Sequence, residues 1–133
     1  MPLTQDRNTP YQDAQCIDVP VAAASHVYAG AMVAANAAGF AVPASTATGL
    51  AYLGRAEHAA DNSAGGNGDM QLAVRRGKAF CWANDGSDPV TQASLGRVCY
   101  MVDDQSVAAT DGTGTRSPAG IVVGIDSNGV WVE

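Results

Sequence analysis

The chain has 133 residues, of which 47% are hydrophobic and only 15% charged, and its net charge is −6 at pH 7. A chain of this length suits one domain, which buries about 68% of its unfolded surface and so needs no disulfide staples. The acidic balance argues against nucleic acid as a direct partner, because phosphate backbones repel a negatively charged protein.

The first residues read as an arm rather than as part of a core. Residues 1–15 show no hydrophobic periodicity and contain two prolines, so we expect an extended arm followed by a β-rich domain over residues 16–133. Fully stretched, fifteen residues span about 50 Å. Arg7 and Tyr11 are the candidate partner contacts of this arm, and simple disorder is the alternative interpretation.

No targeting or membrane segment is expected. The polar start of the chain lacks the charged and apolar regions of a signal peptide. The alanine-rich stretch Val19–Ala38 is interrupted by His26 and Gly30, and alanine contributes little to membrane insertion.

Turn signals rich in glycine, asparagine and proline recur at short intervals along the rest of the chain, with short apolar runs between them. This spacing predicts an all-β fold, a single-domain β-sandwich or β-barrel of which a jelly roll is one form. The expected strands are Cys16–Val21, Met32–Ala34, Phe40–Pro43, Ala51–His58, Met70–Arg75, Ala79–Ala83, Val98–Val102, Ser106–Ala109, Gly120–Ile125 and Val130–Val132.

One short helix is expected among these strands. Thr91 can cap the segment "QASL", and Gly96 can close it in a left-handed conformation. A helix over Ala22–Ala38 is the alternative, because alanine is the best helix former, but that stretch has no charged side chain to form a solvated face.

The last segment predicts a hairpin whose turn uses the positive φ angles that Asn128 and Gly129 tolerate. Alternation places Val130 and Val132 on one face of the closing strand and Trp131 on the other. We expect one face to enter the core and the other to meet more of the fold or a neighbouring subunit, which makes Trp131 a candidate partner contact.

No residue pattern predicts catalysis, a cofactor or a metal centre. Cys16, Cys81 and Cys99 have no disulfide spacing and lie among apolar neighbours, so buried reduced thiols, as in a cytoplasm, are expected. A dyad of Cys81 with His58 lacks a nucleophile elbow and a third partner. A calcium site is the other alternative, although its loop lacks the spacing of an EF-hand; it would use Asp61, Asn62, Asn67 and Asp69.

The stretch "RRGK" is the only basic cluster of the sequence. Arg75, Arg76 and Lys78 are therefore candidate contacts for an acidic partner surface, and a solvated strand end is the alternative interpretation.

Four segments in a fixed order resemble the small capsid decoration, or cement, proteins of tailed phages. They are "YAGAMVAANAAGFAVPAS", "LGRAEHAADNSAGGNGDMQLAVRRGKAFCWAN", "VTQASLGRVCYMVDDQSVAAT" and "SPAGIVVGIDSNGVWVE", so the resemblance covers about residues 16 to 133. It implies a structural protein, made in the host bacterial cytoplasm, that binds the outer capsid surface and bridges subunits of the major capsid protein. It also implies a homo-oligomer, for which we expect a dimer rather than a trimer, and no contact with membrane or nucleic acid.

Two other functions stay open at this stage. A carbohydrate- or cell-surface-binding β-module would present exposed aromatic side chains beside a groove, whereas the eight aromatics of this chain are scattered in sequence. A small β-barrel enzyme would require a pocket that joins His58, a cysteine and a carboxylate.

Overall fold

The computed structural model describes residues 1–133, and its regular secondary structure is almost entirely β, as predicted. A single 3-10 turn, η1 (Gln92–Ser94), is the only helical element. The strands are β1 (Cys16–Pro20), β2 (Ser25–Val27), β3 (Met32–Ala35), β4 (Ala41–Pro43), β5 (Ala51–Ala56), β6 (Ala60–Asn62), β7 (Gln71–Arg75), β8 (Phe80–Asn84), β9 (Val98–Met101), β10 (Ser106–Ala108), β11 (Pro118–Asp126) and β12 (Gly129–Val132).

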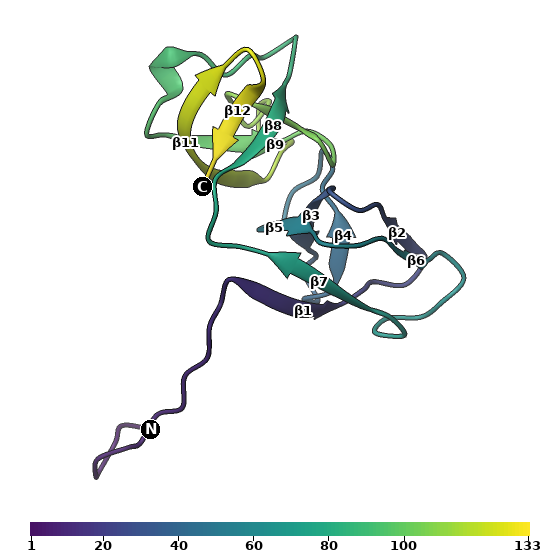
Figure 1. Cartoon of the computed structure of the whole chain (residues 1–133), viewed down its shortest axis with the longest axis vertical. Coiled ribbons are helices and arrows are strands. Elements are labelled where there is room, and N and C mark those ends of the chain that lie inside the picture. The colour runs from purple at the N-terminus through teal and green to yellow at the C-terminus, as the bar shows by residue number, and fades with distance from the viewer.

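The strands form two lobes that follow one another along the chain (Figure 1). The sheet lobe contains a five-stranded sheet in the order β1-β7-β5-β3-β4, together with the β2-β6 pair. The barrel lobe is a closed five-stranded barrel in the order β10-β8-β12-β11-β9. The expected barrel is therefore present, but this strand order is not that of an eight-stranded jelly roll.

The sheet of the first lobe curls until its two edges meet. Val21, which follows β1, bridges Ala41 of β4, and the amide of Ala22 donates a 2.9 Å hydrogen bond to the Ala41 carbonyl. The curled sheet encloses ten buried residues, among them the fully buried Leu72 and Val74. Edge pairing of this kind leaves fewer unpaired backbone groups open to other chains.

The two lobes share part of one core, because β3 is buried on both faces. Val33 packs into the sheet-lobe cluster, whereas Met32 and Ala34 point the other way and join the barrel cluster. This is the alternation of a strand that lies between two packed layers. The shared core joins the lobes more tightly than the single linker between β7 and β8 would.

The sequence predicted most of the strands correctly, but it missed two strands and overestimated the helix. All ten expected strands are present with small shifts at their ends, whereas β2 and β6 were not predicted. The alternative helix over Ala22–Ala38 is wrong, because that stretch forms β2 and β3. The short helix is reduced to η1, where the Thr91 amide donates to Ser94 Oγ at 3.3 Å, and Gly96 adopts the expected left-handed φ of 77°.

The closing hairpin is present, but its turn differs from the predicted one. Asp126 pairs with Gly129, so the turn residues are Ser127 and Asn128, and of these residues only Gly129 has a positive φ, of 144°. The Asp126 side chain accepts a 2.8 Å hydrogen bond from the Asn128 amide and holds the turn. A Cβ at Gly129 would lie 2.3 Å from the Trp82 carbonyl oxygen, so this position has no room for a side chain.

Candidate partner-binding surfaces

The N-terminal arm leaves the sheet lobe at β1 and runs away from the body of the protein (Figure 1). Residues 1–16 are all exposed, including Tyr11 at 99% and Leu3 at 72%. The arm makes one backbone hydrogen bond to the body, at its base, where the Arg76 amide donates to the Gln15 carbonyl at 2.6 Å. The arm thus exposes Leu3 and Tyr11 to solvent, and none of its residues is buried against the rest of the chain.

The basic cluster forms the end of β7 and the linker to β8, beside the base of the arm. Its first member is part of an internal ion-pair network. Arg75 Nε lies 3.2 Å from Glu57 Oε1, and Arg55 Nη2 lies 2.7 Å from the same oxygen. The hydrogen bonds from Arg55 and Arg75 lower the pKa of Glu57. Arg75 therefore has a partner within the chain and is less available to another protein.

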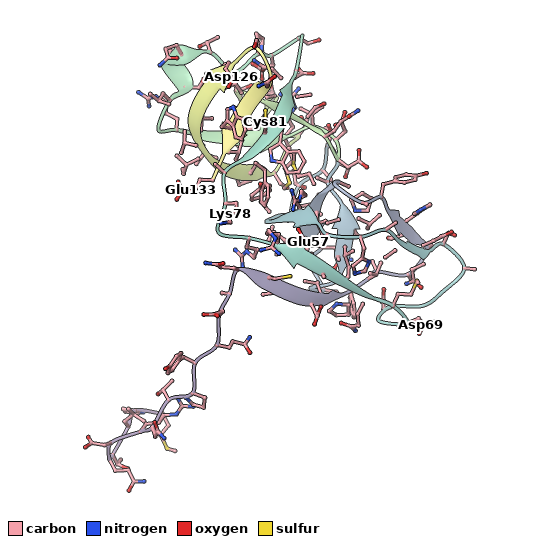
Figure 2. All side chains as sticks on the ribbon, viewed as in Figure 1. Glu57, Asp69, Lys78, Cys81, Asp126 and Glu133 are labelled. Atoms are coloured by element: carbon pink, nitrogen blue, oxygen red, sulfur yellow. The ribbon has the colours of Figure 1, made fainter.

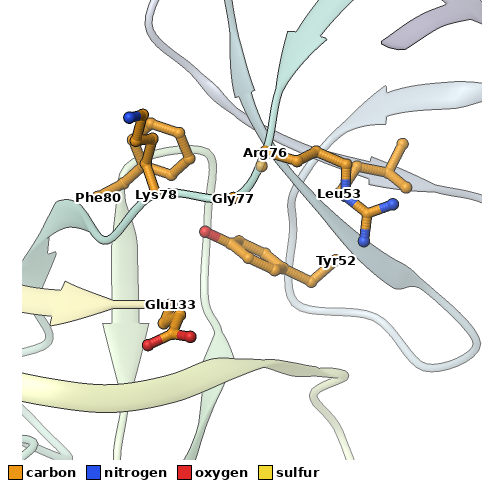
Figure 3. Close-up of a pocket in the computed structure, with 8 residues that line it drawn as sticks. Tyr52, Leu53, Arg76, Gly77, Lys78, Phe80 and Glu133 are labelled. Carbon is orange, nitrogen blue, oxygen red and sulfur yellow. The ribbon is translucent and has the colours of Figure 1, made fainter. Parts of the chain in front are cut away.

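Arg76 and Lys78 are the members of the cluster that remain available. Both are exposed, and neither has a carboxylate partner. They line a pocket of about 110 Å³ at the junction of the lobes, together with Tyr52, Phe80 and Glu133 (Figure 3). Figure 2 shows Lys78 at this junction, on the linker between the sheet and the barrel. Glu133 adds a carboxylate to the same pocket, but neither cation is within ion-pair distance of it, so both can meet an acidic group of a partner.

Trp131 lies on the outer wall of the barrel, as the alternation predicted. Val130 and Val132 are fully buried, whereas Trp131 is partly exposed and pairs with Cys81 of β8. Its indole Nε1 donates a 2.9 Å hydrogen bond to Asp126 Oδ2, and this bond lowers the pKa of the Asp126 carboxyl group. Trp131 does not line the pocket of Arg76 and Lys78, so the candidate contacts do not form one site.

An apolar surface on the barrel was missed by the sequence analysis. We call it the barrel patch; it comprises Leu95, Val98, Ile121 and Val123, which are 38–48% exposed. Ile121 pairs with Val98, and Val122 between the two exposed β11 residues is fully buried. The run "GIVVG" looks uniformly buried in sequence, and only its place in a one-layer barrel wall turns every second side chain outward.

The arrangement of histidine and cysteine does not form a catalytic dyad. His58 Nε2 accepts a 3.1 Å hydrogen bond from the Ala73 amide, and Nδ1 lies 3.0 Å from the Ala59 carbonyl, so both ring nitrogens are occupied. Burial and the nearby Asp126 raise the pKa of Cys81, which disfavours a reactive thiolate.

The cysteines are free, but the prediction that all three are buried is wrong. Cys99 is buried, Cys81 is partly exposed and Cys16 is exposed. Cys16 begins β1 at the edge of the sheet, next to the arm, where nothing covers it.

The residues of the alternative calcium site instead form hydrogen bonds that hold the loop between β6 and β7. Asp61 accepts hydrogen bonds from the Ser63 amide and hydroxyl, Asp69 accepts one from the Gly66 amide, and Asn67 accepts one from the Ala23 amide. Asn62 is buried and presents its nitrogen, not its oxygen, to the carbonyls of Ala22 and Gly66. No group of three or more histidine, cysteine or acidic side chains is placed to hold a metal ion.

No protein-family model, curated protein or solved structure matches this chain. No helix in the structure has the length and apolar character needed to cross a bilayer.

Proposed function

We propose that this chain is a structural virion protein that binds the outer surface of a phage capsid and stabilises it by bridging subunits of the major capsid protein. The observation that carries the proposal is the arm, because it holds Leu3 and Tyr11 in solvent and is anchored to the body only at Gln15. An exposed segment with this composition gains stability when it orders on a partner. The order of the segments that resemble decoration proteins supports the same assignment.

Attachment through the arm requires additional contacts. Ordering the backbone costs about 1–2 kcal/mol per residue, so the arm needs both apolar burial and hydrogen bonds on the partner. Arg76 and Lys78 lie beside the base of the arm and have no carboxylate partners within the chain. They supply a second contact, to an acidic surface of the capsid subunit, and this second contact reduces dissociation of the first.

Self-association is part of the proposal. The barrel patch exposes three apolar side chains on β9 and β11, together with Leu95 at the end of η1, and two copies can cover it in a homodimer. A stable interface buries about 1,600 Å² in total, which a dimer that is also attached to the capsid reaches more readily than a monomer does. We favour a dimer over a trimer, because one small patch fits a two-fold interface.

The protein would be made in the host bacterial cytoplasm and would end on the outer capsid surface. As a structural protein it would need no cofactor and would make no direct contact with nucleic acid or membrane. Its net charge of −6 suits a position on the outside of the shell, away from the packaged genome.

Co-sedimentation with undecorated phage shells tests the proposal. We expect the intact chain to pellet with shells and to raise the temperature at which they release DNA. Removal of residues 2–12 or the Tyr11→Ala substitution should weaken binding, and a double substitution of Arg76 and Lys78 by alanine should weaken it further at low salt. Tyr28→Ala, which removes the same side chain from the body of the protein, is the matched control. Equal binding of the intact and truncated chains would overturn the role of the arm, and no binding of the intact chain would overturn the function.

A further inference from the structure

An open hollow at the junction of the two lobes is separate from the arm, the basic cluster and the barrel patch. It has a volume of about 320 Å³ and is lined by Tyr28, Ala29, Gly30, Ala31, Asp104 and Gln105. The first four residues connect β2 to β3, and the other two lie in the turn between β9 and β10. The small residues at the centre leave the hollow open, since a Cβ at Gly30 would meet no atom within 4 Å.

One wall of the hollow is an exposed aromatic ring that is held in place. Tyr28 is 62% exposed, and its ring packs against that of His26 with a centroid distance of 4.3 Å and an interplanar angle of 32°. The Tyr28 carbonyl accepts a 3.1 Å hydrogen bond from the Ala31 amide, which fixes the backbone of the connection. Because His26 covers one face of the ring, the other face is a preformed apolar platform.

The hollow is also lined by two polar residues, Asp104 and Gln105, whose backbone is held in place. The Asp104 carbonyl accepts a 2.8 Å hydrogen bond from the Met32 amide, and the Gln105 amide donates a 2.9 Å bond to Asp103 Oδ1. The Asp104 carboxylate and the Gln105 side-chain amide make no hydrogen bond within the chain. The lining of the hollow therefore includes a charged acceptor, a neutral acceptor and a donor that have no partner within the chain.

From this arrangement we propose that the hollow is a binding site for a neutral sugar, which includes N-acetylated amino sugars, of a surface polysaccharide. The apolar face of a pyranose ring packs on Tyr28, and its hydroxyl groups meet the Asp104 carboxylate and the Gln105 amide. No cationic side chain lines the hollow, and Asp104 repels negative charge, so acidic sugars are disfavoured.

A cationic head group is the competing ligand chemistry, because a ring and a carboxylate also attract cations. Recognition of ammonium groups typically uses a cage of several aromatic faces, whereas the lining of this hollow contains one aromatic residue, Tyr28, and a glutamine. A wide, open hollow with a mixed donor and acceptor set fits a hydroxylated ring better than it fits a compact cation.

Titration of the isotope-labelled full chain, followed by amide NMR shifts, tests the site. The probes are tetra-N-acetylchitotetraose and maltotetraose as neutral sugars, an oligogalacturonide as an acidic sugar, and choline as a cation. We expect at least one neutral oligosaccharide to shift the amides of Gly30, Ala31 and Gln105 with a millimolar dissociation constant, and the acidic one to bind more weakly. No shift with either neutral sugar, or stronger binding of choline, would overturn the proposal.

Matched variants separate this site from the capsid-binding function. Tyr28→Ala should weaken sugar binding about tenfold, which corresponds to loss of one modest contact, whereas Tyr28→Phe should retain it. Tyr11→Ala removes a tyrosine from the arm and should leave sugar binding unchanged while weakening co-sedimentation with shells. If Tyr28→Ala and Tyr11→Ala bind the sugar equally well, Tyr28 is not the platform and the site is refuted, whatever the result with shells.

Discussion

The hydroxyl group of Tyr52 in the sheet lobe accepts a 3.1 Å hydrogen bond from Nε1 of Trp82 in the barrel lobe. Tyr52 belongs to β5 and Trp82 to β8, so the bond joins two elements that belong to different sheets. Trp82 is buried, and its ring centroid lies 6.0 Å from that of Phe80. Tyr52 packs against the same core cluster. The indole N–H of Trp82 has no other partner at the junction, so any movement of the lobes that breaks this bond would leave a buried donor unpaired. The bond therefore favours one arrangement of the two lobes.

Removal of the Tyr52 hydroxyl should destabilise the whole chain. In Tyr52→Phe the buried Trp82 donor loses its partner, and a buried unsatisfied group costs about 1–3 kcal/mol. Chemical unfolding monitored by tryptophan fluorescence measures the change. Tyr100→Phe is the matched control: the Tyr100 hydroxyl makes no hydrogen bond within the chain, so its loss should change stability by less than about 0.5 kcal/mol. Equal effects of the two substitutions would contradict the structural role of the bond.

The free energy of unfolding should fall in alkaline solution because Tyr52 is buried in its uncharged form. Burial raises the pKa of Tyr52 to about 12, although the bond from Trp82 acts to lower it. An unfolded tyrosine ionises near pH 10, so between about pH 10 and 12 the unfolded chain loses a proton that the folded chain keeps. The free energy of unfolding is therefore unaffected by this group below pH 10 and falls as pH rises through the window, by at most about 2.7 kcal/mol.

The comparison of Tyr52→Phe with the intact chain isolates this contribution. Burial also raises the pKa of Cys99, to about 11, so the intact chain has a second group that weakens folding in alkali. Tyr52→Phe should show a shallower decline between pH 10 and 12 but should retain the part due to Cys99. An identical decline in both proteins would show that Tyr52 ionises normally in the folded state.

The positions of most strands follow from the sequence, because turn residues and apolar alternation are local signals. β7 is an example: its buried Leu72 and Val74 alternate with partly exposed or exposed neighbours, and the segment ends at Arg75. β2 and β6 escaped prediction because each has three residues and they pair only with each other, although three other strands lie between them in the chain. The segments "SHV" and "ADN" also contain polar side chains and lack the apolar alternation that identified the other strands.

The arrangement of the lobes and the exposed surfaces depends on contacts between distant segments. Alternation along "MVAA" places Met32 and Val33 on opposite faces, but nothing local shows that a separate core cluster covers each face. The candidate contacts Arg7 and Tyr11 do lie on an exposed arm, but the ion pair that occupies Arg75 depends on Glu57 of another segment. Likewise, Tyr28 and Asp104 meet at one hollow only because the lobes pack together.

A second pH effect is expected in acid. Asp88 Oδ2 accepts hydrogen bonds from the Thr110 hydroxyl at 2.5 Å and from Arg116 Nη1 at 2.9 Å. The Thr110 hydroxyl, followed by its backbone amide and Arg116, lowers the pKa of Asp88. A lowered folded pKa contributes stability that is present above the unfolded value, near pH 3.9, and is lost as pH falls through the folded pKa.

Asp88→Asn should therefore lower the unfolding midpoint at neutral pH and flatten part of the acid decline. The effect should be large for a surface aspartate, because Arg116 Nε is already buried without a partner and the variant removes the charge that compensates the guanidinium group. Asp111→Asn is the control, since the Asp111 carboxylate makes no hydrogen bond within the chain. Thermal unfolding of both variants from neutral pH into acid measures the difference, and parallel acid curves for Asp88→Asn and the intact chain would refute the assignment.

The loop between β6 and β7 should depend on one buried amide. Asn62 is 2% exposed, and its Nδ2 donates 2.9 Å hydrogen bonds to the carbonyls of Ala22 and Gly66. Asn62→Ala leaves these carbonyls without that donor and should cost about 2–3 kcal/mol, and Asn62→Asp should cost more because a carboxylate would face the carbonyl oxygens. Asn67→Ala, at an exposed position that accepts one bond from Ala23, should cost about 1 kcal/mol. Equal losses at the two positions, measured by chemical unfolding, would contradict this ranking.

The last prediction concerns β12, which lies between β8 and β11 in the closed barrel. Removal of Val130–Glu133 takes away two fully buried valines and the partly buried Trp131, and it opens the barrel along two strand edges. Each buried side chain of this size contributes about 1.5–3 kcal/mol, and the total stability of a domain is only about 5–15 kcal/mol. The exposed edges of β8 and β11 would also be free to pair with other chains. We therefore expect the truncated chain to unfold or aggregate, whereas removal of residues 2–5 from the exposed arm should leave cooperative thermal unfolding unchanged. A soluble chain that lacks the four residues and still unfolds cooperatively would show that the barrel does not need β12 to close.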